Sequence, residues 1–123
     1  MRFRPEQHLR RQADIRAVRE RGSRSDWRFF TCWSLIPKEG SGGHAASAFA
    51  RVAVVASKAA IGNAIERNRA KRHLREVFRR HQKELPAGDH LLIARTAIKF
   101  VPFSELEQRF VAACSHLQGR VRP

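Results

Sequence analysis

The residues best suited to chemistry form one run of cations between Ile65 and Arg80. Seven of these sixteen residues are Arg or Lys, and only Glu66 and Glu76 oppose them. The planar guanidinium of arginine binds phosphate oxygens through two parallel hydrogen bonds and also stacks on bases. This run therefore predicts binding to a polyanion, and nucleic acid is the polyanion that an arginine-rich segment suits best.

The same run favours a helix, because it contains no Pro or Gly and few β-branched residues. One side of this helix carries a mostly apolar stripe at helical spacing, made of Ala70, Leu74, Val77, Phe78 and His81. A polar stripe follows a different side: Asn68, Arg72, Arg75 and Arg79. The alternative is an ordinary solvated helix, but like charges at this spacing cost about 0.2–0.5 kcal/mol per pair. The one-sided charge indicates that a partner supplies the anions.

Charge and composition favour the same class of partner. The chain has 123 residues and a net charge of +14, which implies nucleic acid or an anionic membrane surface. No apolar run approaches the ~18 residues of a spanning helix, and no secretory signal is recognisable. Cys32 and Cys114 lack metal-ligand spacing, which is typical of buried thiols in a reduced cytosol. We therefore expect a cytoplasmic protein with no membrane partner.

The elements around the cationic helix predict a single small α+β domain over residues 1–123. A basic helix is expected at 12–21, strands at 27–36, 49–57 and 89–95, a turn at 58–63 and the cationic helix at 65–83. A last helix should follow Pro102, with Ser104 and Glu107 forming a capping box. Flexible segments are expected at 1–8 and 119–123 and in a Gly-rich loop at 37–48.

The strand at 27–36 carries large apolar groups on both faces. Alternation places Phe30, Cys32 and Ser34 on one face, and the other face holds Phe29, Thr31, Trp33 and Leu35. One face should meet the core. The other is either covered by a helix or open as a stacking platform for unpaired bases.

No constellation indicates a protein catalyst. A nuclease needs metal-binding carboxylates or a poised general base, and the aspartates lie on separate expected elements. His73 and His81 are eight residues apart on the cationic helix, which rules out a pair of metal ligands one turn apart. The sequence therefore predicts no catalytic residue and no metal site on the protein.

The cationic run resembles the signature helix of the bacterial ribonuclease P protein, the small basic partner of the catalytic RNA that matures the 5′ end of precursor tRNA. The resemblance rests on Arg67-Asn68-Arg69, Lys71-Arg72, Arg75-Glu76 and Phe78-Arg79. Flanking matches extend it from about Leu9 to Leu117. It implies a two-layer sandwich of the order helix, strands, basic helix, strand, helix, with a left-handed βαβ crossover.

The resemblance also implies the function. The protein would bind the catalytic RNA and aid endonucleolytic removal of the 5′ leader, while the RNA performs the hydrolysis with Mg²⁺ held mainly by RNA and substrate. No protein partner would be required. The implied RNA-docking residues on the signature helix are Arg67, Asn68, Arg69, Lys71, Arg72, Arg75 and Arg79.

A cleft between the first helix and the sheet is implied for the single-stranded leader of precursor tRNA. Its implied lining is Ile15, Arg19, Phe29, Trp33, Arg51, Lys58 and Arg95. Two slots that hold aromatic residues in the family hold Ile15 and Arg19 here. Stacking would become aliphatic packing at the first and a guanidinium stack or phosphate contact at the second.

Two other functions would also explain the high positive charge. A non-enzymatic RNA-binding protein, such as a ribosomal protein or RNA chaperone, explains it equally well. A DNA-binding helix protein is the third, although the sequence offers neither a helix-turn-helix partner nor a dimer heptad. Cleavage of precursor tRNA by catalytic RNA, with and without the chain, separates these functions.

Overall fold

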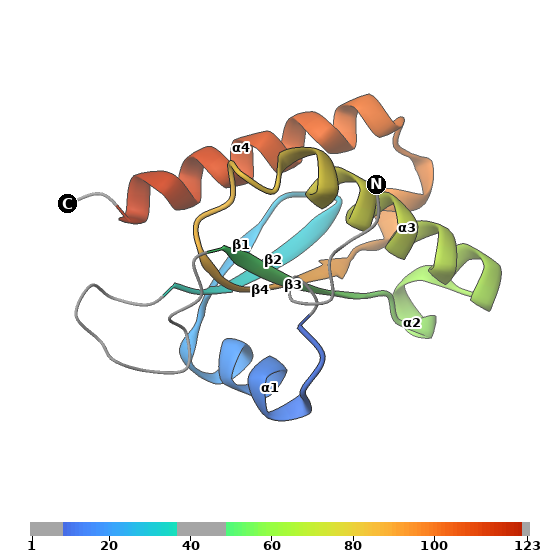
Figure 1. The fold of residues 1–123 in the computed structure, drawn as a ribbon. Coiled ribbons are helices and arrows are strands. Elements are labelled where there is room, and N and C mark those ends of the chain that lie inside the picture. Colours follow the sequence, from blue (N-terminus) through green and yellow to red (C-terminus); the bar gives the residue numbers. More distant parts are fainter. Residues whose placement is uncertain (1–8, 37–48, 122–123) are drawn as a thin grey trace.

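The computed structural model describes residues 9–36 and 49–121, and these form the helices and strands of Figure 1. The bounds are α1 Gln12–Arg21, β1 Ser23–Asp26, β2 Phe30–Leu35, β3 Ala50–Val55, α2 Lys58–Ile61, α3 Ala64–His81, β4 Gly88–Ala94, the 3₁₀ helix η2 Thr96–Phe100, and α4 Phe103–Val121. The segments 1–8 and 37–48, for which flexibility was expected, lie outside the described residues, as do residues 122–123.

The four strands form one mixed sheet in the order β1-β2-β4-β3. β2 pairs antiparallel with both β1 and β4, whereas β3 and β4 pair in parallel. Parallel neighbours need a crossover connection, and α2 and α3 provide it. The α+β class is confirmed, and the left-handed sense of the crossover stays an expectation from the resemblance.

Helices lie on both faces of the sheet. α3 and α4 cover one face, where Phe30, Leu74, Phe78 and Phe110 form the main core. Each such side chain stabilises the fold by about 1.5–3 kcal/mol when fully buried. α1 lies on the opposite face, where Val18 packs in a smaller cluster. The expected helix layer over the sheet is present, and α1 adds a partial layer beyond it.

The strand expected at 27–36 is shorter and is preceded by another strand. β1 is polar and lies at the sheet edge, so it carries no hydrophobic alternation by which to predict it. Arg28 has a φ of 68°, the left-handed region that few residues other than glycine adopt. This turn between Asp26 and Phe30 separates β1 from β2. It also breaks the alternation on which the assignment of Phe29 depended.

The start and end of α4 differ from the prediction. The helix begins at Phe103, and the Pro102 carbonyl accepts the amide N–H of Glu105 at 3.0 Å. Ser104 therefore lies inside the first turn, and the predicted capping box is wrong. The Glu107 carboxylate instead faces α3, where it contacts His81. α4 also continues to Val121, so residues 119–121 of the expected flexible tail are helical.

Candidate nucleic-acid interface

The cationic helix α3 is fixed at its start by a cap and along one side by burial. The Asn63 side-chain oxygen accepts the Glu66 amide N–H at 2.9 Å, which satisfies one of the free donors of the first turn. The apolar stripe is buried in the main core: Ala70, Leu74, Val77 and Phe78. His81 is only half-buried. Packing thus turns the polar stripe to the outside.

The outward side of α3 carries exposed cations that have no partner among the described residues. Asn68, Arg69, Arg72 and Arg75 are exposed, and within residues 9–36 and 49–121 the structure shows no hydrogen bond or ion pair for their side chains. Arginines one turn apart can contact successive phosphates, because each presents a planar fork of donors. The geometry of this stripe therefore suits a run of phosphates.

The other RNA-docking residues predicted on α3 are half-buried or paired within the protein. Arg67 and Lys71 are half-buried, and the Nε of Arg67 is buried without a hydrogen-bond partner in the described structure. Arg79 donates two hydrogen bonds to Glu76, at 2.9 and 2.6 Å. These bonds, with a further one from Arg80, lower the pKa of Glu76 to about 2. Arg79 is therefore an ion-paired residue, unlike Arg72 and Arg75.

On the opposite side of the sheet, α1 brings several of the predicted leader residues together. Ile15 and Trp33 are half-buried against the cluster that contains Val18. The Arg19 guanidinium carbon lies 5.8 Å from the centre of the Trp33 ring. A cation this close to an aromatic face is attracted to it. Arg19 therefore stacks on a residue of its own chain, and Trp33 is neither fully buried nor fully open.

Arg51 is tied to the sheet and to α1. Its guanidinium donates two hydrogen bonds to Asp89, both at 2.8 Å, from β3 to the directly opposite residue of β4. Asp14 of α1 lies 3.9 Å from the same group. The hydrogen bonds from Arg51 to Asp89 raise the pKa of Arg51. This arginine links α1 to the sheet. Because two carboxylates already offset its charge, it attracts a phosphate only weakly.

The other predicted leader residues lie elsewhere. Phe29 is 6% exposed and packs in the main core, so its placement in the lining of the leader cleft is wrong. The left-handed turn at Arg28 is the cause, because it points Phe29 and Phe30 into the same cluster. Lys58 and Arg95 follow the ends of the parallel strands β3 and β4, about 20 Å along the sheet from Arg51.

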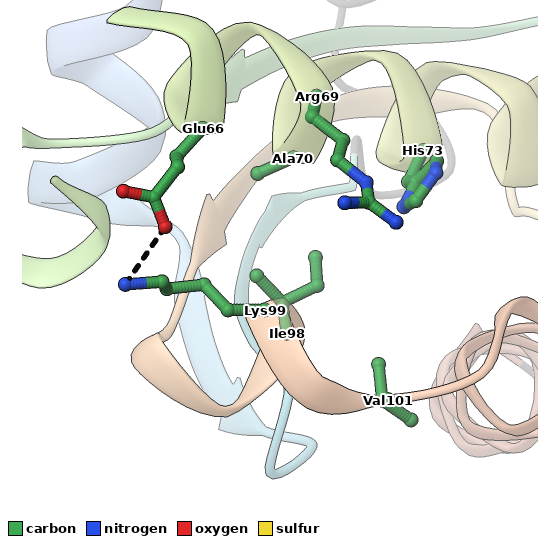
Figure 2. A pocket seen from close by; sticks show the side chains of 7 residues that line it. All are labelled: Glu66, Arg69, Ala70, His73, Ile98, Lys99 and Val101. Atoms are coloured by element: carbon green, nitrogen blue, oxygen red, sulfur yellow. Dashed lines mark ion pairs between the residues drawn. The ribbon is translucent and has the colours of Figure 1, made fainter. Parts of the chain in front are cut away.

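Sequence reasoning missed a pocket between α3 and η2, shown in Figure 2. Its lining is Glu66, Arg69, Ala70, His73, Ile98, Lys99 and Val101. The run Ile98-Lys99-Phe100-Val101 mixes apolar residues with a cation, which is a weak signal for a binding segment. No sequence pattern places this run beside the cationic helix, because η2 packs on α3 only in the folded chain.

A cysteine, a serine and a histidine do meet in the structure, but inside the core. His90 Nε2 donates to the Pro86 carbonyl at 2.8 Å, so Nδ1 accepts from the Ser34 hydroxyl at 2.8 Å. The Cys32 sulfur lies 3.4 Å from that hydroxyl. Burial raises the pKa of Cys32 to about 11 and lowers that of His90 to about 4. Because all three side chains are buried, this neutral network stabilises the fold and cannot contact a substrate.

Neither a metal cluster nor a membrane span is found in the part of the chain that the structure describes. No three His, Cys, Asp or Glu side chains there lie close enough together to hold a metal ion. None of its helices is long and apolar enough to cross a membrane.

The fold and the exposed arginine stripe define the class of small basic α+β proteins with a cationic surface suited to a polyanion. Within that class, the chain belongs to the Ribonuclease P family, whose sequence model matches residues 3–118. The ribonuclease P protein component of Brevibacillus brevis is 35% identical over 101 residues, which are 81% of this chain and 74% of that one. The Stutzerimonas stutzeri protein of the same name is 40% identical over 60 residues, 49% of this chain and 46% of that one.

The alignments differ in length, and the chain spans only about half of some curated relatives, such as 46% of the Stutzerimonas stutzeri protein. Solved structures agree over more of the fold. The ribonuclease P protein of Staphylococcus aureus has a TM-score of 0.71 at 24% identity, covering 94% of this chain and 95% of that one. The Thermotoga maritima protein has a TM-score of 0.72 at 24% identity, covering 89% and 96%. These likenesses support the shared fold.

Proposed function

We propose that this chain is the protein subunit of a ribonuclease P, which binds a catalytic RNA and the 5′ leader of precursor tRNA and aids removal of that leader. The observation that carries the proposal is the exposed stripe of α3. Arg72 and Arg75 lie there without a partner in the described chain, within a protein of this family. A polyanion that binds the stripe would relieve the repulsion between these like charges.

In this proposal the catalytic RNA docks on α3. Asn68, Arg69, Arg72 and Arg75 are the main contacts, with Lys71 and Arg67 beside them. Arg79 contributes less, because the Nε–Nη2 edge of its guanidinium already binds Glu76 and the carboxylate offsets its charge. The proposed docking set is therefore centred on the first three turns of α3.

The leader would run over the α1 side of the sheet, where Ile15, Arg19 and Trp33 lie together. Single strands are held by cations along the backbone and by faces on which bases stack. The Arg19 guanidinium over Trp33 offers a cation and a planar face at one point. Lys58 and Arg95 lie toward the far end of the sheet, and Arg95 is 3.3 Å from Asp26. Arg51 has a supporting role.

Catalysis would belong to the RNA, with Mg²⁺ bound mainly by that RNA and its substrate. Within the described residues no three His, Cys, Asp or Glu side chains form a group that could hold a metal ion. The protein would raise the affinity for precursor tRNA by holding the leader and the catalytic RNA on opposite sides of one sheet. A cytoplasmic location is part of the same proposal.

The test is cleavage of a precursor tRNA by catalytic RNA, at moderate salt and limiting Mg²⁺, with and without the purified chain. We expect the chain to increase cleavage and to leave the cut at the mature 5′ end. A chain that neither binds the RNA nor stimulates cleavage would overturn the proposal. Co-sedimentation with ribosomes and no effect on tRNA ends would favour a ribosomal protein or RNA chaperone instead.

A further inference from the structure

The pocket between α3 and η2 combines an apolar floor with a cationic rim. Ala70, Ile98 and Val101 supply the floor, and Arg69 extends from α3 toward the η2 side (Figure 2). Lys99 reaches across from η2, with its ammonium 3.0 Å from the Glu66 carboxylate. An apolar surface with a few charged groups around it is typical of a site for a small planar group that carries charge at one end.

The charges of the pocket suit one anionic group. Arg69 has no partner within the described residues, whereas Glu66 offsets part of the charge of Lys99. His73 is half-buried, with its ring 5.9 Å from the Phe103 ring. Burial, Arg69 and Arg72 lower its pKa, so the imidazole is neutral at pH 7 and offers one donor and one acceptor. The pocket therefore fits a single phosphate beside a group with polar edges.

An exposed aromatic ring follows Lys99 in η2, outside the lining of the pocket. Phe100 is 78% exposed, and its ring centre is 5.7 Å from the Lys99 ammonium. A phenylalanine that the fold does not bury leaves a π face open to solvent, and every nucleobase can stack on such a face. The adjacent cation strengthens the case for a nucleotide, because base and phosphate would be met together.

From this juxtaposition we propose that Phe100 and the α3–η2 pocket hold one unpaired nucleotide of the catalytic RNA. The base would lie against the ring of Phe100, and its phosphate would contact Lys99 at the Phe100 end of the pocket. The inference rests on the proposed function and extends it to η2. A paired base is not suited to this site, because proteins reach bases in RNA mainly where these are splayed out of the helix.

The catalytic RNA, rather than the leader, is the source that the geometry favours. Arg69 and His73 belong to α3 and lie beside the exposed stripe of Asn68, Arg72 and Arg75. The surface proposed for the leader lies on the other face of the sheet, against α1. A nucleotide in the pocket would thus continue the strand docked on α3.

The first test compares Phe100→Ala with Phe100→Trp in binding to the catalytic RNA at fixed salt. We expect Phe100→Ala to bind about 5- to 100-fold more weakly, which corresponds to the loss of one stacked base. Phe100→Trp keeps a stacking face and should bind like the unmodified chain. Since Phe100 is exposed, both variants should unfold at the temperature of the unmodified chain.

A charge control separates the pocket from the general attraction of a basic protein. Lys99→Ala should lower the slope of log affinity against log salt by part of one unit, because one phosphate contact is lost from a cation whose charge Glu66 already offsets in part. Arg109→Ala removes the same charge from an exposed position of α4 and should leave the slope unchanged. Equal effects of the two substitutions would overturn the inference.

Crosslinking identifies the source of the nucleotide. A photoreactive benzophenone side chain in place of Phe100 should crosslink to an unpaired nucleotide of the catalytic RNA. A crosslink to the leader of precursor tRNA or to a protein, or equal affinity of Phe100→Ala and the unmodified chain, would overturn this inference alone. Failure of the unmodified chain to bind the catalytic RNA would overturn the proposed function and this inference together.

Discussion

Arg79 and Glu76 form a two-bond ion pair one turn apart on α3, with distances of 2.9 and 2.6 Å. The cationic helix therefore carries two kinds of arginine. Arg72 and Arg75 are exposed without a partner within the described structure, whereas Nε and Nη2 of Arg79 already donate to Glu76. A count of basic residues treats them alike, but phosphate can bind the first kind at no cost in lost contacts.

This difference should appear in the salt dependence of RNA binding. Arg72→Ala and Arg75→Ala should each lower the slope of log affinity against log salt by just under one unit, because each removes a phosphate contact. Arg79→Ala should change the slope less. Glu76→Gln should free Arg79 and make the slope steeper. Equal slopes for Arg72→Ala and the unmodified chain would show that this arginine does not contact RNA.

Sequence periodicity predicted α3 well, because a helix that packs on a core must repeat its apolar residues every three to four positions. The buried side chains Leu74, Val77 and Phe78 confirm this. The ion pair of Arg79 was also predictable from the sequence, because Glu76 lies three positions before it in the same helix. The pairing of Arg51 with Asp89 was not, because it depends on the register of β3 and β4 across 38 residues of chain.

The α1 side was the least predictable part of the candidate site. The left-handed residue Arg28 could not be foreseen, since a positive φ is rare in arginine, and it moved Phe29 from the expected face into the main core. β1 has no apolar pattern, and η2 joins α3 only through tertiary packing. Local rules thus identified the cationic helix α3 but not the elements that surround it.

The Arg51–Asp89 pair should support the fold more than RNA binding. Asp89 is 5% exposed, so Asp89→Asn would remove the charge that holds Arg51 and weaken both hydrogen bonds. We expect the free energy of unfolding to fall by about 1.5–3 kcal/mol. Asp26→Asn, at an exposed position, is the matched control and should cost much less. Denaturant unfolding of both variants measures the difference, and equal losses would contradict the structural role.

His81 and His90 should titrate at widely different pH values. Burial lowers the pKa of His90 to about 4. For His81, partial burial acts downward, but hydrogen bonds to Glu107 and Glu84 outweigh it and raise the pKa. NMR titration of the ring protons should show His81 changing above pH 6.5 and His90 unchanged until near pH 4. A His90 that titrates near 6.5 would mean that its network with Ser34 and Pro86 opens in solution.

The same two groups act on stability in opposite directions. His90 takes up its proton more readily when unfolded, so stability should fall as pH drops below about 6.5 and level off near 4. His81 has a raised pKa when folded, so its contribution is present below about pH 6.5 and disappears as pH rises through that pKa. His81→Gln should therefore destabilise the chain more at pH 5 than at pH 9. An equal loss at both pH values would contradict the ion pair with Glu107.

Gly22 fixes the distance between α1 and the sheet, and so the surface proposed for the leader. A Cβ at this position would lie 2.3 Å from the Val18 carbonyl oxygen and 2.7 Å from the Ser34 carbonyl oxygen, and both are backbone atoms that cannot rotate away. Gly22→Ala should therefore displace α1 from β2 and lower the free energy of unfolding by about 2 kcal/mol or more.

Gly119→Ala is the matched control for this substitution, because nothing lies within 4 Å of a Cβ placed there and the residue is helical. It should raise the free energy of unfolding by up to about 0.5–1 kcal/mol, since alanine favours a helix over glycine. Denaturant unfolding of both variants gives the comparison. Gly22→Ala should also weaken binding of a single-stranded leader, because Arg19 moves with α1 away from Trp33. A Gly22→Ala chain as stable as the Gly119→Ala chain would show that α1 is free to move on the sheet.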